Sequence, residues 1–233
     1  MKPFFRPVLL LLLNCLAACC RKDPIIPVPT GPPVILCAGD SITAAKYPGY
    51  LQQLMEKNGL LVQVINAGRK GDSTAEYIRF LDKSRILERT DPSWVLLQLG
   101  TNDLRIDSHA TTTEQFIKNI EAILDRIERH HRPDGSSARV ILATIPPIRL
   151  EIRWHFDVSS RVRVEAEINP AIRDIARRRG LILADHHAIF AARPELLKDI
   201  HPSREGYRVL AAAWYRILAP LLLSAAAHQN GTR

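Results

Sequence analysis

Short apolar runs alternate with amphipathic stretches along the chain from about residue 34 to residue 223. The runs are five to seven residues long and rich in leucine or β-branched residues, as expected of strands buried on both faces. They lie at Val34 to Ala38, Leu60 to Asn66, Trp94 to Leu99, Arg139 to Thr144 and Leu181 to Asp185. This pattern predicts five strands of a parallel sheet.

The stretches between these runs have helical periodicity. Apolar residues recur at helical spacing from Phe116 to Ile127, and Thr111-x-x-Glu114 just ahead of them fits a capping box. Tyr207 to Leu221 repeat the pattern in a final helix, which Pro220 is expected to kink or end. Alternating strands and helices predict an α/β protein, a three-layer α/β/α sandwich with a five-stranded parallel, flavodoxin-like sheet.

The first eighteen residues follow a different pattern. Two basic residues precede an apolar run from Val8 to Leu13 that continues, with only Asn14 intruding, to Ala18. The run is short for a membrane span and predicts a signal peptide over residues 1–18. It ends in Leu16-Ala17-Ala18-Cys19, which looks like a bacterial lipobox, so Cys19 is the expected lipidation site. The alternatives are an ordinary signal peptide cleaved among small residues, or a short uncleaved anchor.

Residues 19–33 contain five prolines, which predicts an extended tether after the lipidated cysteine. A single domain is expected over residues 34–223, and a disordered tail over residues 224–233. This layout predicts an exported protein that is lipid-anchored to the bacterial cell envelope, at the outer or the cytoplasmic membrane. Its domain would face the periplasm or the exterior.

Charge and cysteine content exclude several function classes. The formal net charge is +8, but the basic residues are scattered, so no nucleic-acid partner is expected. Their densest run, Arg177-Arg178-Arg179 before Gly180, is typical of a solvated helix end, with attraction to anionic lipids as the alternative. Cys37 lies within the first strand and is expected to act as a small apolar residue. No metal-ligand spacing occurs, and neither a metal nor a cofactor is expected.

Glycines and polar residues directly follow the first three predicted strands. They are Gly39-Asp40-Ser41, Asn66-Ala67-Gly68-Arg69-Lys70-Gly71 and Gly100-Thr101-Asn102-Asp103. Parallel strands end at one edge of a sheet, where α/β folds place their chemistry. These loops offer a hydroxyl nucleophile, a glycine amide and an amide side chain, which acyl transfer requires together with a base. The base is expected at His201, and Asp40 and Asp103 are interpreted as supports for their loops.

These three loops and the segment that contains His201, in this order, resemble the four sequence blocks of the SGNH (GDSL-type) hydrolases, a family of esterases and lipases. The likeness runs from Val34 to about Leu218. It implies that Ser41 is the nucleophile and His201 the base, and that Gly71 and Asn102 form the oxyanion hole with the Ser41 amide. It also implies a carboxylic ester hydrolase that works through an acyl-enzyme.

One tripeptide in the chain competes with the proposed nucleophile. Gly71-Asp72-Ser73 repeats the sequence around Ser41. Ser73-x-x-Glu76 opens a helical stretch, however, so the Ser73 hydroxyl is assigned to a helix N-cap. Ser41 directly follows a buried strand and is therefore the preferred nucleophile.

The acid of the catalytic triad departs from the family pattern. The family usually places it three residues before the histidine, where this chain has Lys198, whereas Asp199 is one residue closer. We favour a tighter turn in which Asp199 still orients His201. The alternative is a Ser-His dyad in which Asp199 caps a helix. Asp185 is the second candidate acid, and the neighbouring His186 and His187 are expected to have structural roles.

The resemblance leaves several substrate classes open, because the family includes carbohydrate acetylesterases, lysophospholipases and thioesterases. An exported, tethered enzyme meets glycans and lipids more readily than acyl-CoA. We therefore expect hydrolysis of acetyl or other short acyl esters, with carbohydrate deacetylation favoured and a lysophospholipase or thioesterase-like lipid hydrolase as the alternative. A degenerate protein that binds glycan or cell wall without turnover is a further alternative, supported by Lys198 alone. The expected partners are an acyl ester substrate and the membrane, and the sequence does not define an oligomeric state.

Overall fold

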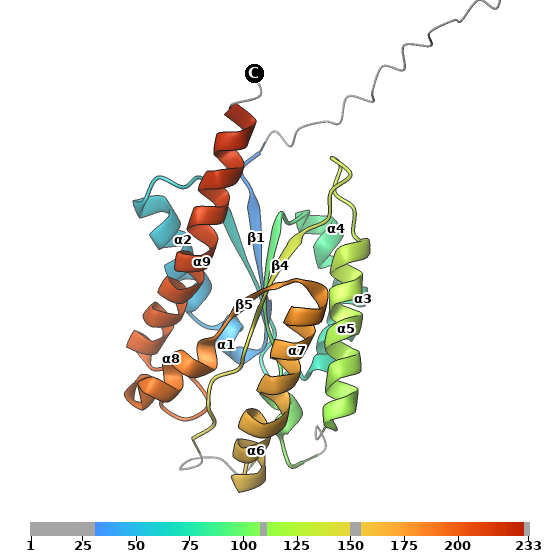
Figure 1. The fold of residues 1–233 in the computed structure, drawn as a ribbon, viewed down its shortest axis with the longest axis vertical. Helices are drawn as coiled ribbons and strands as arrows, with labels where there is room; N and C mark the ends of the chain where they lie inside the picture. The colour runs from blue at the N-terminus through green and yellow to red at the C-terminus, as the bar shows by residue number, and fades with distance from the viewer. Residues whose placement is uncertain (1–30, 108–110, 150–154, 231–233) are drawn as a thin grey trace, which may run out of the picture.

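A computed structural model of the chain describes residues 31–107, 111–149 and 155–230. The expected signal peptide, the Cys19 lipidation site and most of the tether lie outside these residues. Within them, the strands and helices form a single layered body (Figure 1).

The centre of the fold is a sheet of five parallel strands in the order β2-β1-β3-β4-β5, the flavodoxin-like order (Figure 1). The strands are β1 (Val34–Gly39), β2 (Gln63–Gly68), β3 (Trp94–Gln98), β4 (Arg139–Ala143) and β5 (Ile182–Ala184). The predicted parallel sheet is confirmed. The second strand begins three residues later than predicted, because Val34 opens β1 and pairs with Gln63, which leaves Leu60 to Val62 with no strand beside them.

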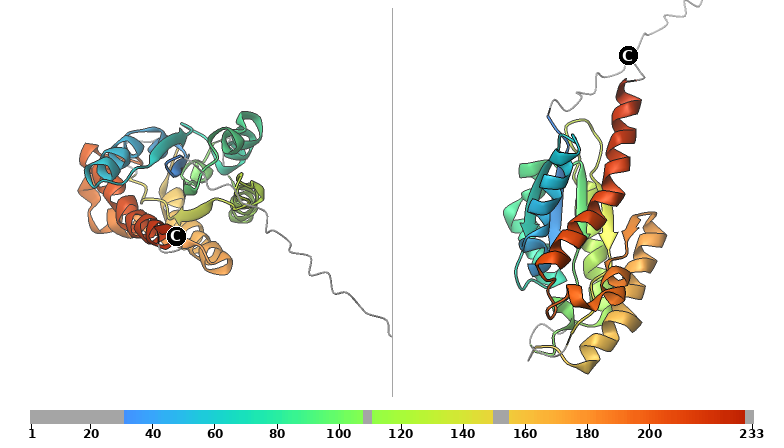
Figure 2. Two further views of the ribbon diagram at one scale, coloured as in Figure 1. Left: turned by 90° about the horizontal axis from the view of Figure 1, so that it is seen from above. Right: turned by 90° about the vertical axis from the view of Figure 1, so that its left-hand side faces the viewer.

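Helices cover both faces of the sheet, which confirms the three-layer architecture (Figure 2). One face packs against α3 (Thr74–Ser84), α5 (Thr113–Arg129) and α7 (Asn169–Arg179), and the other against α2 (Tyr47–Lys57), α8 (His186–Ala192) and α9 (Arg204–Asn230). The remaining helical segments are α1 (Ser41–Ala44), α4 (Ile86–Thr90), α6 (Val158–Arg163), a π-turn (Val164–Ile168) and two 3-10 turns (Asn102–Leu104 and Pro194–Leu196).

The strands contribute alternate residues to two apolar cores, one on each side of the sheet. In β1, Leu36 and Ala38 enter the core beneath α5, whereas Ile35 and Cys37 enter the core beneath α9. Cys37 is a free, fully buried thiol whose pKa is raised to about 12 by burial. It behaves as the small apolar residue that the sequence predicts.

The cap of α5 differs by one residue from its prediction. The apolar stripe from Phe116 to Ile127 is buried as expected. The N-cap is Thr112, whose hydroxyl accepts a hydrogen bond from the Gln115 amide at 3.2 Å. Thr111 is engaged elsewhere, because its amide donates to the Asp103 carbonyl at 3.1 Å. The loop that follows β3 therefore decides where this helix begins.

The final helix is longer than predicted. Pro220 does not end α9, and the helix continues to Asn230. Proline removes one backbone donor, and the carbonyl four residues earlier belongs to Arg216, an exposed position where water can replace the lost bond. The expected disordered tail is thus helical as far as Asn230.

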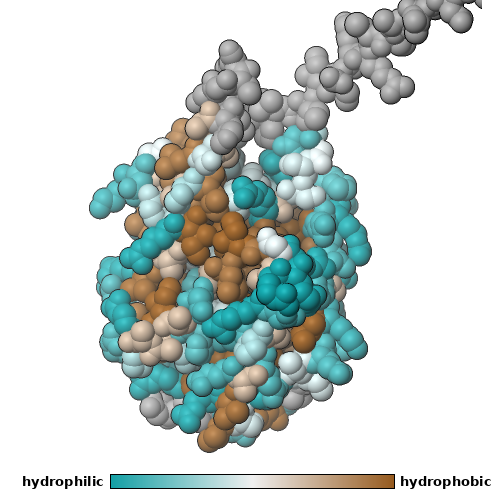
Figure 3. All heavy atoms as spheres, in the orientation of Figure 1, coloured by the Kyte–Doolittle hydropathy of each residue, from teal (hydrophilic) through white to brown (hydrophobic). Residues whose placement is uncertain are grey.

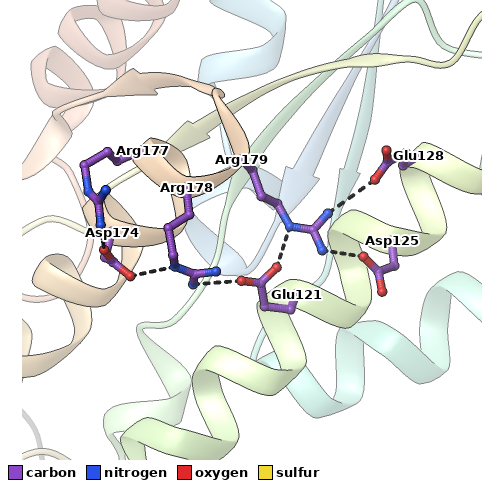
Figure 4. A network of polar contacts seen from close by, with 7 residues as sticks. All are labelled: Glu121, Asp125, Glu128, Asp174, Arg177, Arg178 and Arg179. Carbon is purple, nitrogen blue, oxygen red and sulfur yellow. Dashed lines mark hydrogen bonds and ion pairs between the residues drawn. The ribbon is translucent and has the colours of Figure 1, made fainter.

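The three arginines at the end of α7 form an ion-pair network at a helix end that is solvated as predicted, with the Arg177 side chain 75% exposed (Figure 4). Gly180 caps the helix in the left-handed conformation, as predicted, with a φ of 63°. The guanidinium groups pair with Asp174 on their own helix and with Glu121, Asp125 and Glu128 on α5. The run therefore ties α7 to α5 across one face of the sheet.

Candidate active site

Ser41 lies at the turn between β1 and α1, at the carboxyl edge of the sheet. Asp40 caps the short helix, and its Oδ1 accepts a hydrogen bond from the Ile42 amide at 2.9 Å. Gly39 lets this turn close tightly, because a Cβ there would lie 2.1 Å from the Thr43 hydroxyl oxygen. The buried strand and the capped helix together fix the backbone that carries the Ser41 hydroxyl.

The loop after β2 lies directly against α1. A Cβ on Gly68 would be 2.0 Å from the Ala44 nitrogen, and the Arg69 amide donates to the Gly39 carbonyl at 2.8 Å. Farther along this loop, Gly71 has a φ of +81°, which favours glycine. A Cβ built on Gly71 would meet no atom within 4 Å, so space is open beside its backbone.

His201 bridges Ser41 and Asp199. Its Nε2 lies 2.9 Å from the Ser41 Oγ, and its Nδ1 lies 3.0 Å from Asp199 Oδ1. These contacts fit the tautomer in which Nδ1–H donates to the carboxylate and Nε2 accepts from the serine hydroxyl. The structure therefore brings together the three residues that the sequence nominated, with Asp199 in the place of the acid.

The turn from Lys198 to His201 explains how the closer aspartate reaches the imidazole. Asp199 Oδ1 also accepts a hydrogen bond from the His201 amide at 2.7 Å, which folds its side chain back over the turn. The Lys198 amide donates to the His201 carbonyl at 3.0 Å, and an isolated bridge pairs Leu197 with Pro202. The turn is closed by backbone contacts, so the Lys198 side chain is not needed for it.

Asn102 lies in the turn that follows β3, and β3 is the strand next to β1. Its side chain is buried, and its Nδ2 donates to the Asp72 carbonyl at 3.0 Å. This bond joins the Asn102 loop to the segment that contains Gly71. The two loops expected to form the oxyanion hole are therefore held side by side.

A buried polar network lies behind these two loops. Asp103 accepts hydrogen bonds from the Thr74 amide at 2.9 Å and from the Thr74 hydroxyl at 2.5 Å. Asn119 of α5 donates to the same hydroxyl at 2.9 Å. Sequence reasoning missed Thr74 and Asn119, although Asn119 is a polar residue within the otherwise apolar stripe of α5 and could have signalled a buried contact.

Two buried carboxyl groups flank the loops of the site. Burial raises the pKa of Asp40 to about 6, and the nearby charge of Asp103 adds to this shift. Burial also raises the pKa of Asp103 to about 6, against the opposing effect of its hydrogen bonds to Thr74. Neither aspartate contacts His201 in the described hydrogen bonds, and both lie within the loops that carry Ser41 and Asn102, as the sequence predicted.

Ser73 occupies the N-cap of α3 rather than a catalytic position. Its hydroxyl accepts from the Glu76 amide, and the Glu76 carboxylate accepts from the Ser73 amide at 2.8 Å. This is the capping box that the sequence predicted. The hydroxyl is thus committed to the start of a helix.

The polar residues after β5 have structural partners. Asp185 caps α8 by accepting from the Ala188 amide, and its other carboxylate oxygen pairs with Arg173 at 2.9 Å. His186 is fully buried and contacts Gln98 at 3.1 Å, and burial lowers its pKa to about 3. His187 is half-buried, and burial lowers its pKa as well. These contacts agree with the structural roles expected for both histidines.

Comparison with known proteins agrees with this geometry. The profile of the GDSL-like Lipase/Acylhydrolase family matches residues 37–209, which include all four site segments. No match is found among curated protein sequences. A solved structure of the lipase/acylhydrolase from Enterococcus faecalis is similar, with a TM-score of 0.67 and 26% identity over 80% of this chain and 95% of that one.

Two further solved structures share the fold at lower identity. An acetylxylan esterase from Geobacillus stearothermophilus has a TM-score of 0.65 and 19% identity, over 80% of this chain and 94% of that one. A carbohydrate acetylesterase family member from Sinorhizobium meliloti has a TM-score of 0.66 and 19% identity, over 82% of this chain and 99% of that one. The family profile spans most of the domain, and the chain belongs to the GDSL-like lipase/acylhydrolase family, the SGNH hydrolases.

Proposed function

We propose that this protein is a serine ester hydrolase that forms an acyl-enzyme on Ser41 and cleaves acetyl or other short acyl esters of carbohydrates. One observation carries the proposal: Ser41, His201 and Asp199 form an unbroken chain of contacts of 2.9 and 3.0 Å. A serine hydroxyl is a weak nucleophile until a positioned base accepts its proton. The imidazole is in place to do so, and the carboxylate is in place to orient it.

In the proposed first half-reaction, His201 Nε2 takes the Ser41 proton as Oγ attacks the ester carbonyl carbon. The carbonyl oxygen becomes an oxyanion, held by the Ser41 amide, the Gly71 amide and the Asn102 side chain. The intermediate then collapses, the carbon–oxygen bond to the alcohol breaks, and His201 returns its proton to the leaving alcohol. Asp199 stabilises the imidazolium between these steps.

In the second half-reaction, water takes the place of the alcohol. His201 removes a proton from the water as its oxygen attacks the acyl carbon of acyl-Ser41. A second oxyanion forms in the same hole and collapses, which breaks the bond to Ser41 Oγ and releases the carboxylic acid. His201 gives the proton back to the serine.

The contact between Asn102 and Asp72 supports the role of the asparagine. An amide nitrogen carries two hydrogens, and one of them is directed to the Asp72 carbonyl at 3.0 Å. That bond holds the plane of the side chain, while the second hydrogen stays available to a substrate oxygen. A donor held in place before the reaction needs no reorganisation when negative charge develops.

Carbohydrate esters are favoured as substrates by two considerations. Two proteins that share the fold are named as an acetylxylan esterase and as a carbohydrate acetylesterase family member. The N-terminal sequence is also that expected of an exported, tethered protein, which would meet glycans outside the cytoplasm.

A lipid acyl ester is the second candidate, and a group of exposed apolar residues favours it. Ile106, Val158 and Val162 are 51%, 59% and 53% exposed. Ile106 lies four residues after Asn102, and α6 is joined to the same loop because the Ser160 hydroxyl donates to the Leu104 carbonyl at 2.7 Å. An apolar surface beside this loop would suit a longer acyl chain.

The test is hydrolysis of p-nitrophenyl esters together with labelling by a fluorophosphonate probe. The wild-type protein should turn over the acetyl ester and become labelled, whereas Ser41→Ala should do neither. Ser73→Ala is the matched control and should remain labelled. Hydrolysis by Ser41→Ala at the wild-type rate would exclude the proposed nucleophile. A wild-type protein that is neither labelled nor active would indicate a binding protein without turnover.

Acyl chain length separates the two substrate candidates. A sharp preference for acetyl supports carbohydrate esters, and acetylated xylo-oligosaccharide should then be a substrate. Tolerance of chains of about eight carbons or more would support the lipid candidate, because each buried methylene contributes about 0.8 kcal/mol.

A further inference from the structure

The final helix extends beyond the sheet that it covers (Figure 1). At 1.5 Å per residue, the 27 residues of α9 span about 40 Å, whereas the six residues of β1 span about 20 Å. One face of the helix packs on the domain through Tyr207, Leu210, Trp214, Leu218 and Leu222. Its last turns pass the edge of the sheet at which the strands begin.

These last turns are unusually apolar for a helix end in water. No Lys, Arg, Asp or Glu occurs from Ile217 to Asn230. Leu223 is 58% exposed, and Ser224, Ala225 and Ala227 are exposed beside it. Figure 3 shows apolar atoms along the upper half of α9. A helix that ends in solvent commonly carries Lys or Arg in its last turn, whereas the last turn of α9 carries His228 and neither of these.

Among the described residues, α9 is the one helix long and apolar enough by composition to cross a membrane. α9 packs against the sheet and α2 as a helix of the domain does. If it spanned a membrane, the core beneath it would have to be dismantled. Contact of its exposed end with a lipid surface requires no such change. An apolar helix end of this kind can enter the boundary between headgroups and acyl chains.

Leu61 gives a second apolar residue at the same end of the domain. It is 85% exposed and lies just before β2. Its neighbours Leu60 and Val62 pack against the core beneath α9. Because the sheet is parallel, the start of β2 lies at the same edge as the start of β1. The large apolar side chain at position 61 therefore faces solvent at the edge where α9 ends.

The chain enters the domain at this edge as well. Gly31 is the first described residue, and β1 begins at Val34, at the same end of the domain as the end of α9 (Figure 1). The 30 preceding residues include the apolar run from Val8 to Ala18 and Cys19. The segment expected to reach the membrane thus joins the domain at the same end as the exposed apolar end of α9.

We propose that the surface formed by Leu61, Leu223 and the last turns of α9, here called the basal surface, docks on a lipid bilayer. Ser41, Asn102 and His201 lie at the opposite edge of the sheet, about 20 Å away along the strands. Docking turns the site away from the membrane. The consequence for substrates rests on the proposed function: the enzyme acts on esters in the surrounding aqueous space, such as glycans, and not on lipids of the bilayer that holds it.

Photocrosslinking of the full chain in its membrane tests the docking. A benzophenone amino acid is placed at Leu223 or at Leu61, and at Glu195 as the control. The Glu195 side chain is 66% exposed and lies in the 3-10 turn just before the segment that carries His201, at the opposite end of the domain. After illumination, positions 223 and 61 should form adducts with phospholipid, and position 195 should form roughly tenfold fewer. All three positions are exposed, so the variants should fold, which their thermal unfolding checks.

Each other outcome overturns the proposal. Equal lipid adducts at positions 223 and 195 would mean that the domain has no fixed orientation. An adduct of twice the chain mass would assign the basal surface to a second copy, and an adduct with another protein would assign it to a protein partner. No adduct at positions 223 and 61 would leave the surface in water. Lipid crosslinking needs no catalysis, so ester hydrolysis measured on the same membranes reports separately on the proposed function.

Discussion

The carboxylate of Asp103 holds both the backbone amide and the hydroxyl of Thr74, at 2.9 and 2.5 Å. Asp103 follows Asn102 directly, and Thr74 begins α3 just after the loop that contains Gly71. The pair therefore fixes the distance between the two loops proposed to form the oxyanion hole. It lies in the interior, where Asp103 and Thr74 are fully buried.

Thr74→Val should lower kcat by roughly tenfold or more while changing KM little, because it removes a hydrogen bond that positions the oxyanion donors. It should also cost about 1 to 3 kcal/mol of unfolding free energy, since Asp103 and Asn119 lose a buried partner. Steady-state kinetics and urea unfolding measure the two effects. Thr74→Ser keeps the hydroxyl and should restore kcat. A Thr74→Val enzyme that is less stable but keeps its kcat would show that the pair is only structural.

Asp199→Asn should lower kcat strongly, towards the loss of about 10⁴ seen for the corresponding change in the chymotrypsin-type triad. The amide can present its nitrogen to His201 Nδ1 and favour the wrong tautomer. Asp185→Asn is the matched control and should keep the wild-type rate, because Asp185 caps α8 and pairs with Arg173. Lys198→Ala should also be active. A loss below about tenfold for Asp199→Asn would indicate a Ser-His dyad.

Asn102→Ala should slow turnover by roughly 10² to 10³, the usual effect of removing one oxyanion donor. Its effect on kcat should exceed its effect on KM, because the donor acts on charge that develops in the transition state. Burst-phase and steady-state measurements with p-nitrophenyl acetate separate acylation from deacylation, and both should slow. A change of less than about threefold would remove Asn102 from the proposed hole.

Asp40→Asn should make the protein more stable at neutral pH. The pKa of Asp40 is raised by burial from 3.8 to about 6, so the folded state binds this proton more tightly than the unfolded state. The unfolding free energy therefore falls as pH rises from about 4 to about 6, by up to about 3 kcal/mol for this group. Asparagine keeps the oxygen that accepts from Ile42 and removes the charge.

Urea unfolding of the wild-type protein and of Asp40→Asn at several pH values measures this difference. The difference in unfolding free energy between the two proteins should grow from pH 4 to pH 6 and then stay constant. Asp103 titrates in the same range, so the unfolding free energy of the variant still falls somewhat as pH rises. His186 is unchanged in both proteins and cancels in the comparison. Parallel curves across this range would contradict the predicted burial cost of Asp40.

Gly39→Ala should destabilise the domain by about 3 kcal/mol or more and abolish ester hydrolysis. The new Cβ would lie 2.1 Å from the Thr43 hydroxyl oxygen and 2.4 Å from the Gln98 carbonyl oxygen, so α1 would be pushed off the strand ends. Gly49→Ala is the matched control. Gly49 is exposed within α2 and has nothing within 4 Å of an added Cβ, so alanine should stabilise by about 0.5 to 1 kcal/mol. Thermal unfolding of both variants makes the comparison.

Much of this fold could be predicted from the sequence, because its strands carry a local signal. A run such as Trp94 to Leu97 is apolar throughout, since both faces of a central parallel strand are buried. The helical periodicity of residues 116–127 was equally clear. The boundaries were less predictable: β2 begins where β1 begins beside it, and α5 begins one residue later than predicted because Asp103 engages the Thr111 amide.

The sequence by itself indicated the family and nominated its site residues, because Ser41, Gly71, Asn102 and His201 each belong to a short local block. It also assigned Ser73 to a helix cap, since a capping box depends only on residues three apart. Only the tertiary structure decided that Asp199 reaches His201, that Thr74 joins two loops through Asp103, and that Gly39 lets α1 lie against the sheet. These relationships depend on distances between segments far apart in the chain, or on the closure of one turn, which no local pattern of residues encodes.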